Sequence, residues 1–491
     1  MADELTPETP DEAEQPIKQR KNGLYPGVSD ELADSMKSGW ADTELRDLQP
    51  VEQAPNAAER RAALSRRFPG ERLVIPAGNL KTRSNDTEYS FRAATEYVYL
   101  TGDQTDDSVL VLEPRGGGAE GAEGHDATLY RLPRSDRENG EFWLDGMGEL
   151  WVGRRHSLTE AEVLYGLPCK DVRELADALK EATGPVRVVR GHDAGIEAAL
   201  TDKVTAERDE ELRVYLSEAR LVKDAFEVAE LQKAVDSTVR GFEDVVKVLD
   251  KAEATSERYI EGTFFLRARV EGNDVGYGSI CAAGPHACTL HWVRNNGEVR
   301  SGDLLLLDAG VETNSLYTAD VTRTLPINGR YSDLQRKIYD AVYAAQEAGI
   351  AAVKPGAGFR DFHDAAQRVL TEHLVEWGLV EGPVERVLEL GLQRRWTLHG
   401  TGHMLGLDVH DCAAARTESY VNGTLEPGMV LTVEPGLYFQ ADDLTVPEEY
   451  RGIGVRIEDD ILVTSDGNRN LSAGLPRRSD EVEEWMARLK G

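Results

Sequence analysis

Several acidic residues stand at the ends of runs that are otherwise apolar and rich in strand-forming residues. Asp308 follows four consecutive leucines, Glu434 follows the run VLTV, and Glu458 follows the run VRI. An ionised carboxylate that leaves water costs several kcal/mol or more unless it is paired, binds a cation or keeps its proton. One such residue could simply end a strand. Several of them together predict a fold in which strand ends meet around bound cations.

A fourth carboxylate extends this set. Asp320 lies in the β-favouring run TADVT, twelve positions after Asp308. If a hairpin joins LLLLDAG to ADVTRTLP, the two aspartates can face each other across neighbouring strands. The segments of Glu434 and Glu458 could supply a second such pair. Four clustered carboxylates carry more negative charge than one divalent cation neutralises, so the sequence predicts two cations.

The segment HGTGHMLGLDVHD supplies histidines that could complete such a site. It contains His399, His403 and His410, and its glycines and lack of helical period indicate a loop rather than the HExxH zinc helix. A neutral imidazole can complete the coordination of a metal that is otherwise held by oxygen. Spacing alone does not decide which of the three histidines is the ligand. A structural or surface role is the alternative for each of them.

The length and the local patterns divide the chain into three parts. A chain of 491 residues is too long for one ordinary core, so we expect two domains and extra segments. Residues 1–55 are acidic, rich in proline and without a sustained apolar period, which predicts a disordered arm. Short β-rich runs alternate with helical segments over 56–220, typical of an α/β domain. Residues 221–491 form the second domain.

The second domain is expected to be a curved antiparallel sheet with helices outside it. Helices are predicted over 225–249, 256–271, 332–353 and 360–377, and the strand-like pieces include CTLHWV, DLLLLDAG, ADVTRTLP, MVLTVEPG and VRIEDDILV. In the third helix, Leu334, Ile338, Val342 and Ala345 give one apolar face, and Ser332 is suited to cap its first turn.

The composition excludes some classes of partner. The formal net charge of −32 argues against nucleic acid and against anionic membrane surfaces, which both require clustered Lys and Arg. No run approaches the ~18 apolar residues of a membrane span. The first residues lack a secretory signal pattern, and the four cysteines form no CxxC pair. We therefore expect a soluble cytoplasmic protein with reduced thiols.

At these motifs the sequence resembles the aminopeptidase P and prolidase branch of the creatinase and methionine-aminopeptidase superfamily. The matching segments, in the family order, are LLLLDAG, ADVTRTLP, HGTGHMLGLDVHD, LTVEPGLY and VRIEDDILV. The resemblance covers nearly the whole chain from about residue 60. It implies a creatinase-like N-terminal α/β domain followed by a catalytic domain of the pita-bread fold.

The resemblance also implies a dinuclear metal site. Its ligands would be Asp308, Asp320, His403, Glu434 and Glu458, with Asp320 and Glu458 bridging the two metals. The oxygen-rich shell favours two Mn²⁺ per subunit, with Co²⁺ or Zn²⁺ as substitutes. The two aspartates lie one position farther apart than is usual in the family. We place the extra residue in the hairpin turn around Thr313 to Ser315, because an insertion within a strand would turn the following side chains to the other face.

Further residues match family positions around the metals. His291, His399 and His410 correspond to histidines that line the family's site, and Arg456 and Tyr438 to residues that form a hydrogen-bonded network there. An ordinary strand ion pair is the alternative for Arg456. Glu434 is our candidate for moving the proton during hydrolysis, and His410 for stabilising the oxyanion.

The implied activity is removal of the first residue from peptides with proline in second position. The stretch SNDTEYSFRAATEYVYLTG resembles the N-terminal domain of aminopeptidase P and favours that activity over prolidase, which accepts only dipeptides. A non-catalytic peptide-binding module of the same fold is the alternative from another class, although such modules usually have broken metal ligands. The resemblance also implies a homo-oligomer, either a dimer or a tetramer.

Overall fold

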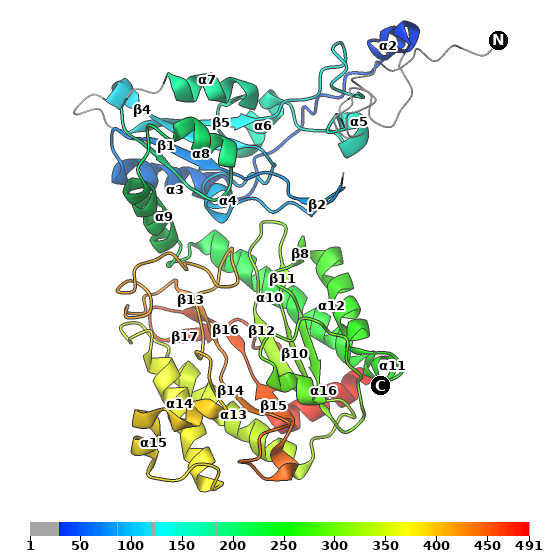
Figure 1. Cartoon of the computed structure of the whole chain (residues 1–491), viewed down its shortest axis with the longest axis vertical. Coiled ribbons are helices and arrows are strands. Elements are labelled where there is room, and N and C mark those ends of the chain that lie inside the picture. Colours follow the sequence, from blue (N-terminus) through cyan, green and yellow to red (C-terminus); the bar gives the residue numbers. More distant parts are fainter. Residues whose placement is uncertain (1–28, 86, 119–123, 145, 182–183, 491) are drawn as a thin grey trace, which may run out of the picture. The chain divides into compact units, whose positions relative to one another are not determined.

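The computed structural model describes residues 29–490 except 86, 119–123, 145, 182 and 183. The chain packs into two compact units, Met1–Arg213 and Val214–Gly491. The division lies inside helix α9 (Ala206–Ala219), whereas the sequence placed it after residue 220. Figure 1 shows both units, and each is described by itself below.

The first unit contains a five-stranded mixed sheet in the order β6-β5-β4-β1-β7. The β1–β4 and β4–β5 ladders are antiparallel, and the β5–β6 and β1–β7 ladders are parallel. The strands are β1 (Arg72–Pro76), β4 (Val109–Pro114), β5 (His125–Arg131), β6 (Cys169–Asp171) and β7 (Val186–Val188), and a separate hairpin pairs β2 (Thr82–Ser84) with β3 (Thr87–Glu88). The predicted α/β class of this unit is confirmed.

Most helices of this unit are short, and one apolar cluster joins helices and strands. The helices are α2 (Asp30–Met36), α3 (Ala54–Arg67), α4 (Thr95–Thr101), α5 (Glu149–Val152), α6 (Leu158–Tyr165), α7 (Leu175–Lys180) and α8 (Ala194–Leu200), with 3-10 turns at Arg115–Gly118 and Val172–Glu174. Val74 and Val188 on neighbouring strands pack with Leu175 and Leu179 of α7 and with Leu200 of α8.

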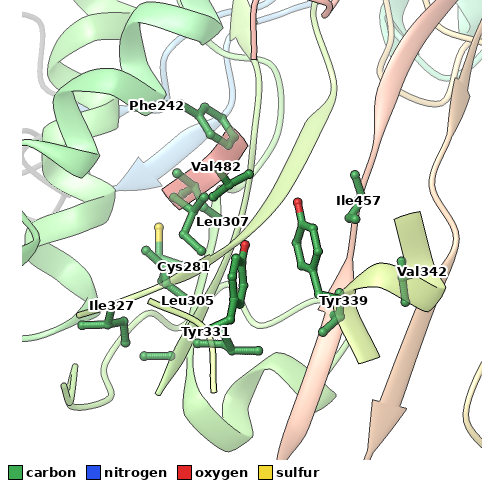
Figure 2. Packing of buried hydrophobic residues seen from close by; sticks show 14 of the residues in the cluster. Phe242, Cys281, Leu305, Leu307, Ile327, Tyr331, Tyr339, Val342, Ile457 and Val482 are labelled. Carbon is green, nitrogen blue, oxygen red and sulfur yellow. The ribbon is translucent and has the colours of Figure 1, made fainter. Parts of the chain in front are cut away.

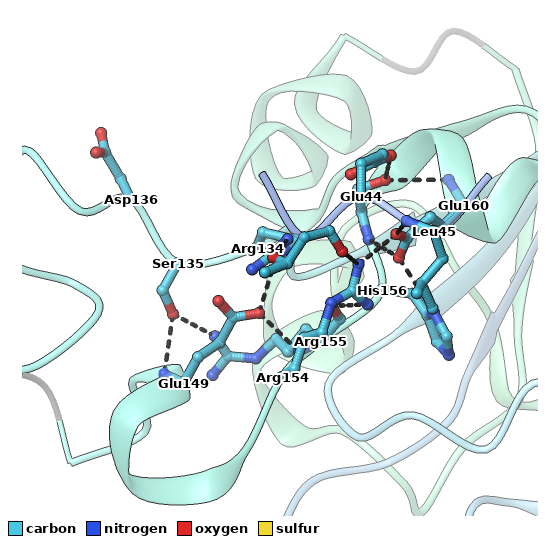
Figure 3. Close-up of polar contacts among 12 residues, drawn as sticks. Glu44, Leu45, Arg134, Ser135, Asp136, Glu149, Arg154, Arg155, His156 and Glu160 are labelled. Carbon is cyan, nitrogen blue, oxygen red and sulfur yellow. Dashed lines mark hydrogen bonds and ion pairs between the residues drawn. The ribbon is translucent and has the colours of Figure 1, made fainter. Parts of the chain in front are cut away.

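The segment before α3 is held by polar contacts, as Figure 3 shows. Residues 1–28 of the expected disordered arm lie outside the described residues. Further along, the backbone N–H of Leu45 donates to Glu160 Oε1 at 2.5 Å, and Ser157 Oγ donates to Glu44 at 2.5 Å. Glu160 is buried and also accepts from Arg154. Around Glu44 and Leu45 the segment thus differs from the expected disorder, because one backbone N–H and one side chain find partners at the start of α6.

Every strand ladder of the second unit is antiparallel among the residues described. The strand orders are β12-β10-β9, β11-β8, β13-β16-β17 and β14-β15. The strands are β8 (Asp274–Val275), β9 (Ile280–Ala283), β10 (Leu304–Ala309), β11 (Val311–Glu312), β12 (Val321–Pro326), β13 (Val430–Val433), β14 (Gly436–Phe439), β15 (Ile453–Arg456), β16 (Asp459–Val463) and β17 (Asn468–Asn470). A bridge between Thr322 and Glu458 connects the early strands with the late ones.

Two sets of helices cover these strands. α10 and α12 pack on each other and against β8, β9 and β11, while α13 and α14 pack on each other and α13 reaches β13, β14 and β15. The helices are α10 (Ala225–Val246), α11 (Leu249–Glu253), α12 (Glu257–Glu271), α13 (Asp333–Ala352), α14 (Asp361–Glu376), α15 (Val384–Leu390) and α16 (Ser479–Lys490), with 3-10 turns at Gly284–Cys288, Leu392–Arg395 and Glu448–Tyr450. The predicted fold class is confirmed for this unit as well.

The apolar core of the second unit lies between these helices and strands. Figure 2 shows Leu305 and Leu307 of β10 with Phe242 of α10, Val342 of α13 and Val482 of α16. Alternation along β10 explains this placement, because Leu305 and Leu307 face the core on one side of the strand. Leu306, which points to the other side, packs in a second cluster. One buried strand therefore supports apolar side chains on both faces and ends at Asp308.

Helix α13 begins where the sequence predicts. Ser332 is its N-cap and accepts a hydrogen bond from the N–H of Gln335, whose side chain in turn accepts from the N–H of Ser332. This reciprocal pair satisfies two amide groups that the first turn leaves unpaired. The predicted apolar face is buried at Ile338, Val342 and Ala345.

The strand predicted at CTLHWV is wrong. Residues 289–296 follow the 3-10 turn Gly284–Cys288 without forming a strand. Trp292 instead stacks on His286 at a ring distance of 3.9 Å and donates its indole N–H to Glu257 at 2.8 Å. These contacts override the β propensity of the segment.

Each helix among the described residues falls short of the length or of the apolarity that crossing a lipid bilayer requires.

Candidate active site

The hairpin of β10 and β12 brings the two predicted aspartates together. Asp308 pairs in register with Thr322 of β12, and Asp320 immediately precedes that strand. The connection turns at residues 313–317, where Leu316 adopts a positive φ of 69°. Both aspartates are buried. The turn thus lies where the extra residue was expected.

Tyr277 joins these aspartates and was missed by sequence analysis. Its hydroxyl lies 2.6 Å from Asp308 Oδ1 and 2.5 Å from Asp320 Oδ1. A phenol has one proton to donate, so the second contact between oxygens is favourable only if that carboxyl carries a proton or shares a cation. The immediate neighbours of Tyr277, VGYGS, show neither a charge nor an apolar run, and thus gave no signal.

The two predicted glutamates come from the other half of the sheet. Glu458 lies between β15 and β16, and its Oε2 accepts a hydrogen bond from Thr322 Oγ1 at 2.6 Å. Glu434 follows β13, and its backbone N–H donates to the carbonyl of Thr401 at 2.8 Å. Glu458 is only 1% exposed. The bridge at Thr322 therefore connects the aspartate hairpin directly to Glu458.

His403 faces the carboxylates from its loop. Its Nε2 lies 3.3 Å from Asp320 Oδ2 and 3.6 Å from Glu434 Oε1. Its Nδ1 lies 3.1 Å from the carbonyl of Met404, to which it donates, and this leaves Nε2 directed at the acids. Asp320, His403 and Glu458 offer ligand atoms that all lie within 4.8 Å of one another. The structure therefore brings all five predicted ligands into one cluster, in which the two aspartates and Glu458 are buried and His403 and Glu434 are half-buried.

The electrostatics of this cluster fit a cation. Burial, reinforced by the neighbouring carboxylates, raises the pKa of Glu434 to about 7 and that of Glu458 well above its ordinary value. Burial likewise raises the pKa of Asp308, although Arg456 opposes the rise. Burial disfavours the imidazolium of His403, yet its contact with Asp320 raises the pKa of His403 to about 9. Four carboxylates and one imidazole suit a divalent metal with hard oxygen ligands, which would relieve this repulsion.

A chain of hydrogen bonds leads from Asp308 through Arg456 and Tyr438 to His399. Arg456 donates to Asp308 Oδ2 at 2.5 Å and to the hydroxyl of Tyr438 at 3.0 Å. The hydroxyl of Tyr438 lies 2.7 Å from Nε2 of His399, whose Nδ1 faces the carbonyl of Gly400 at 2.6 Å. Burial, with the charge of Arg456, lowers the pKa of His399 to about 4. His399 is therefore neutral, with its Nδ1 protonated and its Nε2 accepting from Tyr438.

The other two predicted histidines lie at the border of the cluster. The ring of His410 lies 4.3 Å from that of His403, edge to face. Burial, followed by the charge of His403, lowers the pKa of His410. His291 is exposed in the loop that follows the 3-10 turn, and its charge contributes to the lowered pKa values of His399 and His410.

Residues behind the cluster were also missed by sequence analysis. His363 of α14 lies 2.8 Å from Thr401 Oγ1 and accepts the N–H of Thr401. The buried Asp460 accepts the backbone N–H of Asp320 at 3.1 Å. These contacts fix the backbone next to the metal-ligand candidates, and only the folded chain shows which distant segments meet there.

Comparison with known proteins identifies the class. The model of metallopeptidase family M24 matches residues 229–465, and the model of the aminopeptidase P N-terminal domain matches residues 57–189. The chain belongs to metallopeptidase family M24, of the aminopeptidase P type. The expected family, fold class and enzyme class are confirmed, and the family and the acidic cluster indicate dependence on a metal.

The chain is also similar over most of its length to individual proteins and solved structures. The chain is 84% identical, over the whole of both chains, to a Streptomyces coelicolor protein named Xaa-Pro aminopeptidase 1. It is 32% identical to the Xaa-Pro aminopeptidase of Escherichia coli, over 87% of this chain and 96% of that one. Among solved structures, Pseudomonas aeruginosa aminopeptidase PepP has a TM-score of 0.79 at 32% identity, over 90% of this chain and 100% of that one. Aminopeptidase P from E. coli with the inhibitor Pro-Leu has a TM-score of 0.79 at 30% identity, with the same coverage.

Proposed function

We propose that this metallopeptidase hydrolyses the first peptide bond of peptides with proline in second position and releases the first amino acid. The observation that carries the proposal is the convergence of Asp308, Asp320, His403, Glu434 and Glu458 in a chain that is 84% identical to an Xaa-Pro aminopeptidase over its whole length. All five positions keep side chains that can bind a metal. This retention argues against a non-catalytic peptide-binding module.

The metal complement that we propose is two Mn²⁺ ions held by these five residues. Bound divalent cations supply a hydroxide nucleophile near neutral pH and polarise the carbonyl that is attacked. The oxygen-rich donor set favours Mn²⁺, and Co²⁺ or Zn²⁺ could substitute.

The residues of the chain position the substrate and move the proton. Glu434, with a pKa raised to about 7, can accept a proton at its carboxylate and deliver it to the leaving proline nitrogen. His410 stands beside His403 and can donate a hydrogen bond to the developing oxyanion. An Xaa-Pro bond has no amide N–H on its leaving side. Recognition of the proline residue therefore depends on the shape of the site around its ring and on neutral groups such as His399 and Tyr438.

One experiment separates this activity from prolidase. Manganese-loaded protein is incubated with Gly-Pro and with Arg-Pro-Pro, and the products are identified by mass spectrometry. Release of arginine from the tripeptide is the expected result. Turnover of the dipeptide alone would favour prolidase, and turnover of neither peptide would favour the binding module.

Replacing Glu434 with Gln tests the proton-transfer role. The amide keeps the size of the side chain but cannot accept the proton, so kcat should fall by about 10² to 10⁴ on both peptides. Stopped assays over a range of enzyme concentrations measure this loss, and retained turnover would contradict the role.

We further propose that the enzyme is a cytoplasmic homo-oligomer, a dimer or a tetramer, whose partners are peptide substrates. The four cysteines are buried and free, which suits a reducing compartment. Light scattering of the purified chain measures the subunit number, and a monomer at all concentrations would contradict the oligomer.

A further inference from the structure

A pocket of about 820 Å³ opens beside the candidate active site within the second unit. Its walls come from α14, α15, the 3-10 turn Leu392–Arg395 and residues 397–400. Its volume lies in the range of ordinary ligand pockets. The mechanism above uses none of its residues except His399.

The pocket collects cationic side chains in a strongly acidic protein. Arg360, Arg368 and Arg394 line it, although the formal net charge of the chain is −32. Arg368 pairs with Glu385, and Arg360 donates to the amide oxygen of Asn422. Among the described residues, no carboxylate lies within ion-pair distance of Arg360 or Arg394. Two guanidinium groups thus remain available to an anionic ligand.

The acidic residues of the lining do not cancel this charge. Asp364 and Glu389 also line the pocket, but Glu389 already accepts from Arg386 at 2.6 Å. The pKa of His363 reflects these charges. Burial lowers this pKa, Asp364 opposes the change, and Arg360 and Arg394 lower it further. The pocket therefore favours carboxylate over ammonium.

His399 connects the pocket with the reacting bond. It lines the pocket, bonds to Tyr438, and places its Nδ1 3.6 Å from Glu434 Oε2. Within the acidic cluster, Glu434 serves the leaving nitrogen and lies next to His399, so the free amine of the substrate belongs with the other carboxylates. The part of a peptide that follows proline must then continue past His399. An extended chain advances about 3.3 to 3.6 Å per residue, so the next few residues reach the pocket.

We propose that this pocket binds the residues that follow proline and selects substrates with a carboxylate there. The inference rests on the proposed peptidase function and specifies its preferred substrates. The carboxylate can be the C-terminus of a short peptide or an acidic side chain of a longer one. Arg360 and Arg394 are the residues that would pair with it, because their guanidinium groups present several donors to a carboxylate.

The test compares three peptides that differ only in the position of the carboxylate. They are Ala-Pro-Ala-Ala with a free C-terminus, the same peptide as its C-terminal amide, and Ala-Pro-Ala-Glu amide. The native enzyme should cleave the free acid with a kcat/KM about three- to tenfold above that of the amide, mainly through KM, since the contact is remote from the reacting bond. If the glutamate peptide has the same kcat/KM as the free acid, the pocket also accepts a side-chain carboxylate. If its kcat/KM equals that of the alanine amide, the pocket accepts only the carboxylate of the C-terminus.

Two charge reversals and a matched control locate the effect. R394E and R360E should each abolish or invert the ratio of acid to amide. R488E changes an exposed arginine on α16, outside the pocket lining, and should keep the native ratio. Thermal unfolding of each variant reports on folding.

Equal kcat/KM for acid and amide in the native enzyme would overturn the inference, as would an unchanged ratio in both charge reversals. Either result would leave the proposed function intact, because Xaa-Pro cleavage still occurs. Failure of the native enzyme to cleave all three peptides would instead overturn the proposed function and this inference together.

Discussion

At the scale of single residues, the site depends on neutral groups that carry no sequence signal. The acids were identified because a charge inside an apolar run is costly, and this physical argument needs no structure. Tyr277 contacts both aspartates. A tyrosine between two glycines is also common in loops without a functional role, so its local sequence does not mark it. The choice of His403 over His399 and His410 as the ligand came only from resemblance. Spacing could not decide it, because all three side chains come from one irregular loop and His399 and His410 also lie beside the cluster.

Replacing Tyr277 with Phe should weaken metal binding while preserving the fold. The ring stays, but the hydroxyl that orients Asp308 and Asp320 is lost. Such supporting contacts typically change metal affinity by about 10- to 100-fold. Titration calorimetry with Mn²⁺ on the metal-free variant measures the change. Tyr259→Phe, on the exposed surface of α12, is the control, and equal affinities in the two variants would refute the orienting role.

At the scale of elements, the loop that carries His403 requires a close approach of two backbones. A Cβ built on Gly402 would lie 2.0 Å from the carbonyl oxygen of Thr432 in β13, whereas one on Gly400 meets nothing closer than 4.0 Å. The N–H of Thr432 also donates to the carbonyl of His403 at 2.9 Å. The loop therefore lies against β13 as closely as a strand, which its glycine-rich sequence did not indicate.

Replacing Gly402 with Ala should displace His403 and reduce activity. Overpacking of this kind costs about 1 to 3 kcal/mol, occasionally more, and here the obstacle is a backbone atom that cannot rotate away. Gly400→Ala is the matched control, for which we expect only a small change in stability. Chemical unfolding of both variants measures the loss of stability, and their metal content reports whether His403 is displaced. Similar metal content in the two would show that the loop adapts.

The segment that precedes α3 depends on one buried carboxylate. Glu160 accepts from Leu45, Arg154 and Ser157, and these contacts outweigh its burial and lower its pKa to about 2. A lowered carboxyl pKa contributes stability that is present above the ordinary value of 4.5 and is lost as the pH falls toward 2.

Glu160→Gln should therefore loosen residues 42–45 at neutral pH. The amide can still accept from the first turn of α6 but loses its ion pair with Arg154, at a cost of about 1 to 3 kcal/mol. Hydrogen exchange at the N–H of Leu45 should accelerate. Glu59→Gln, on the exposed side of α3, serves as the control, and equal exchange rates in the two variants would contradict the anchoring role.

At the scale of the whole molecule, the five ligand candidates span residues 308 to 458 and meet only because the two halves of the second unit join at Thr322 and Glu458. Apolar periodicity and a capping serine predicted α13 and its bounds to within a residue, because those signals are local. The segment CTLHWV failed for the opposite reason, since its Trp292 is held by the distant Glu257. The contacts of Glu44 and Leu45 with the start of α6 could likewise not be inferred from composition.

The acidic cluster gives the metal-free molecule a stability that depends on pH in a definite direction. Glu434 has a folded-state pKa of about 7 against an ordinary 4.5, so the metal-free fold loses stability as pH rises from 4.5 through 7. His403 has a folded-state pKa of about 9 against an ordinary 6.5, so its contribution is complete below 6.5 and is lost as pH rises through 9. Both groups act in the same direction, and bound cations would remove both effects by replacing the protons.

Chelation should consequently destabilise the protein more at pH 8.5 than at pH 5.5. The unfolding midpoint of protein treated with a chelator is compared with that of manganese-loaded protein at each pH. The loaded form gains RT ln(1 + [metal]/Kd), and deprotonated ligands make Kd smaller at the higher pH. The self-repulsion of a chain with net charge −32 affects both forms alike and cancels in the difference. A difference that is equal at the two pH values would mean that the buried carboxylates are already ionised and compensated without metal, and the pKa shifts that define this cluster would then be wrong.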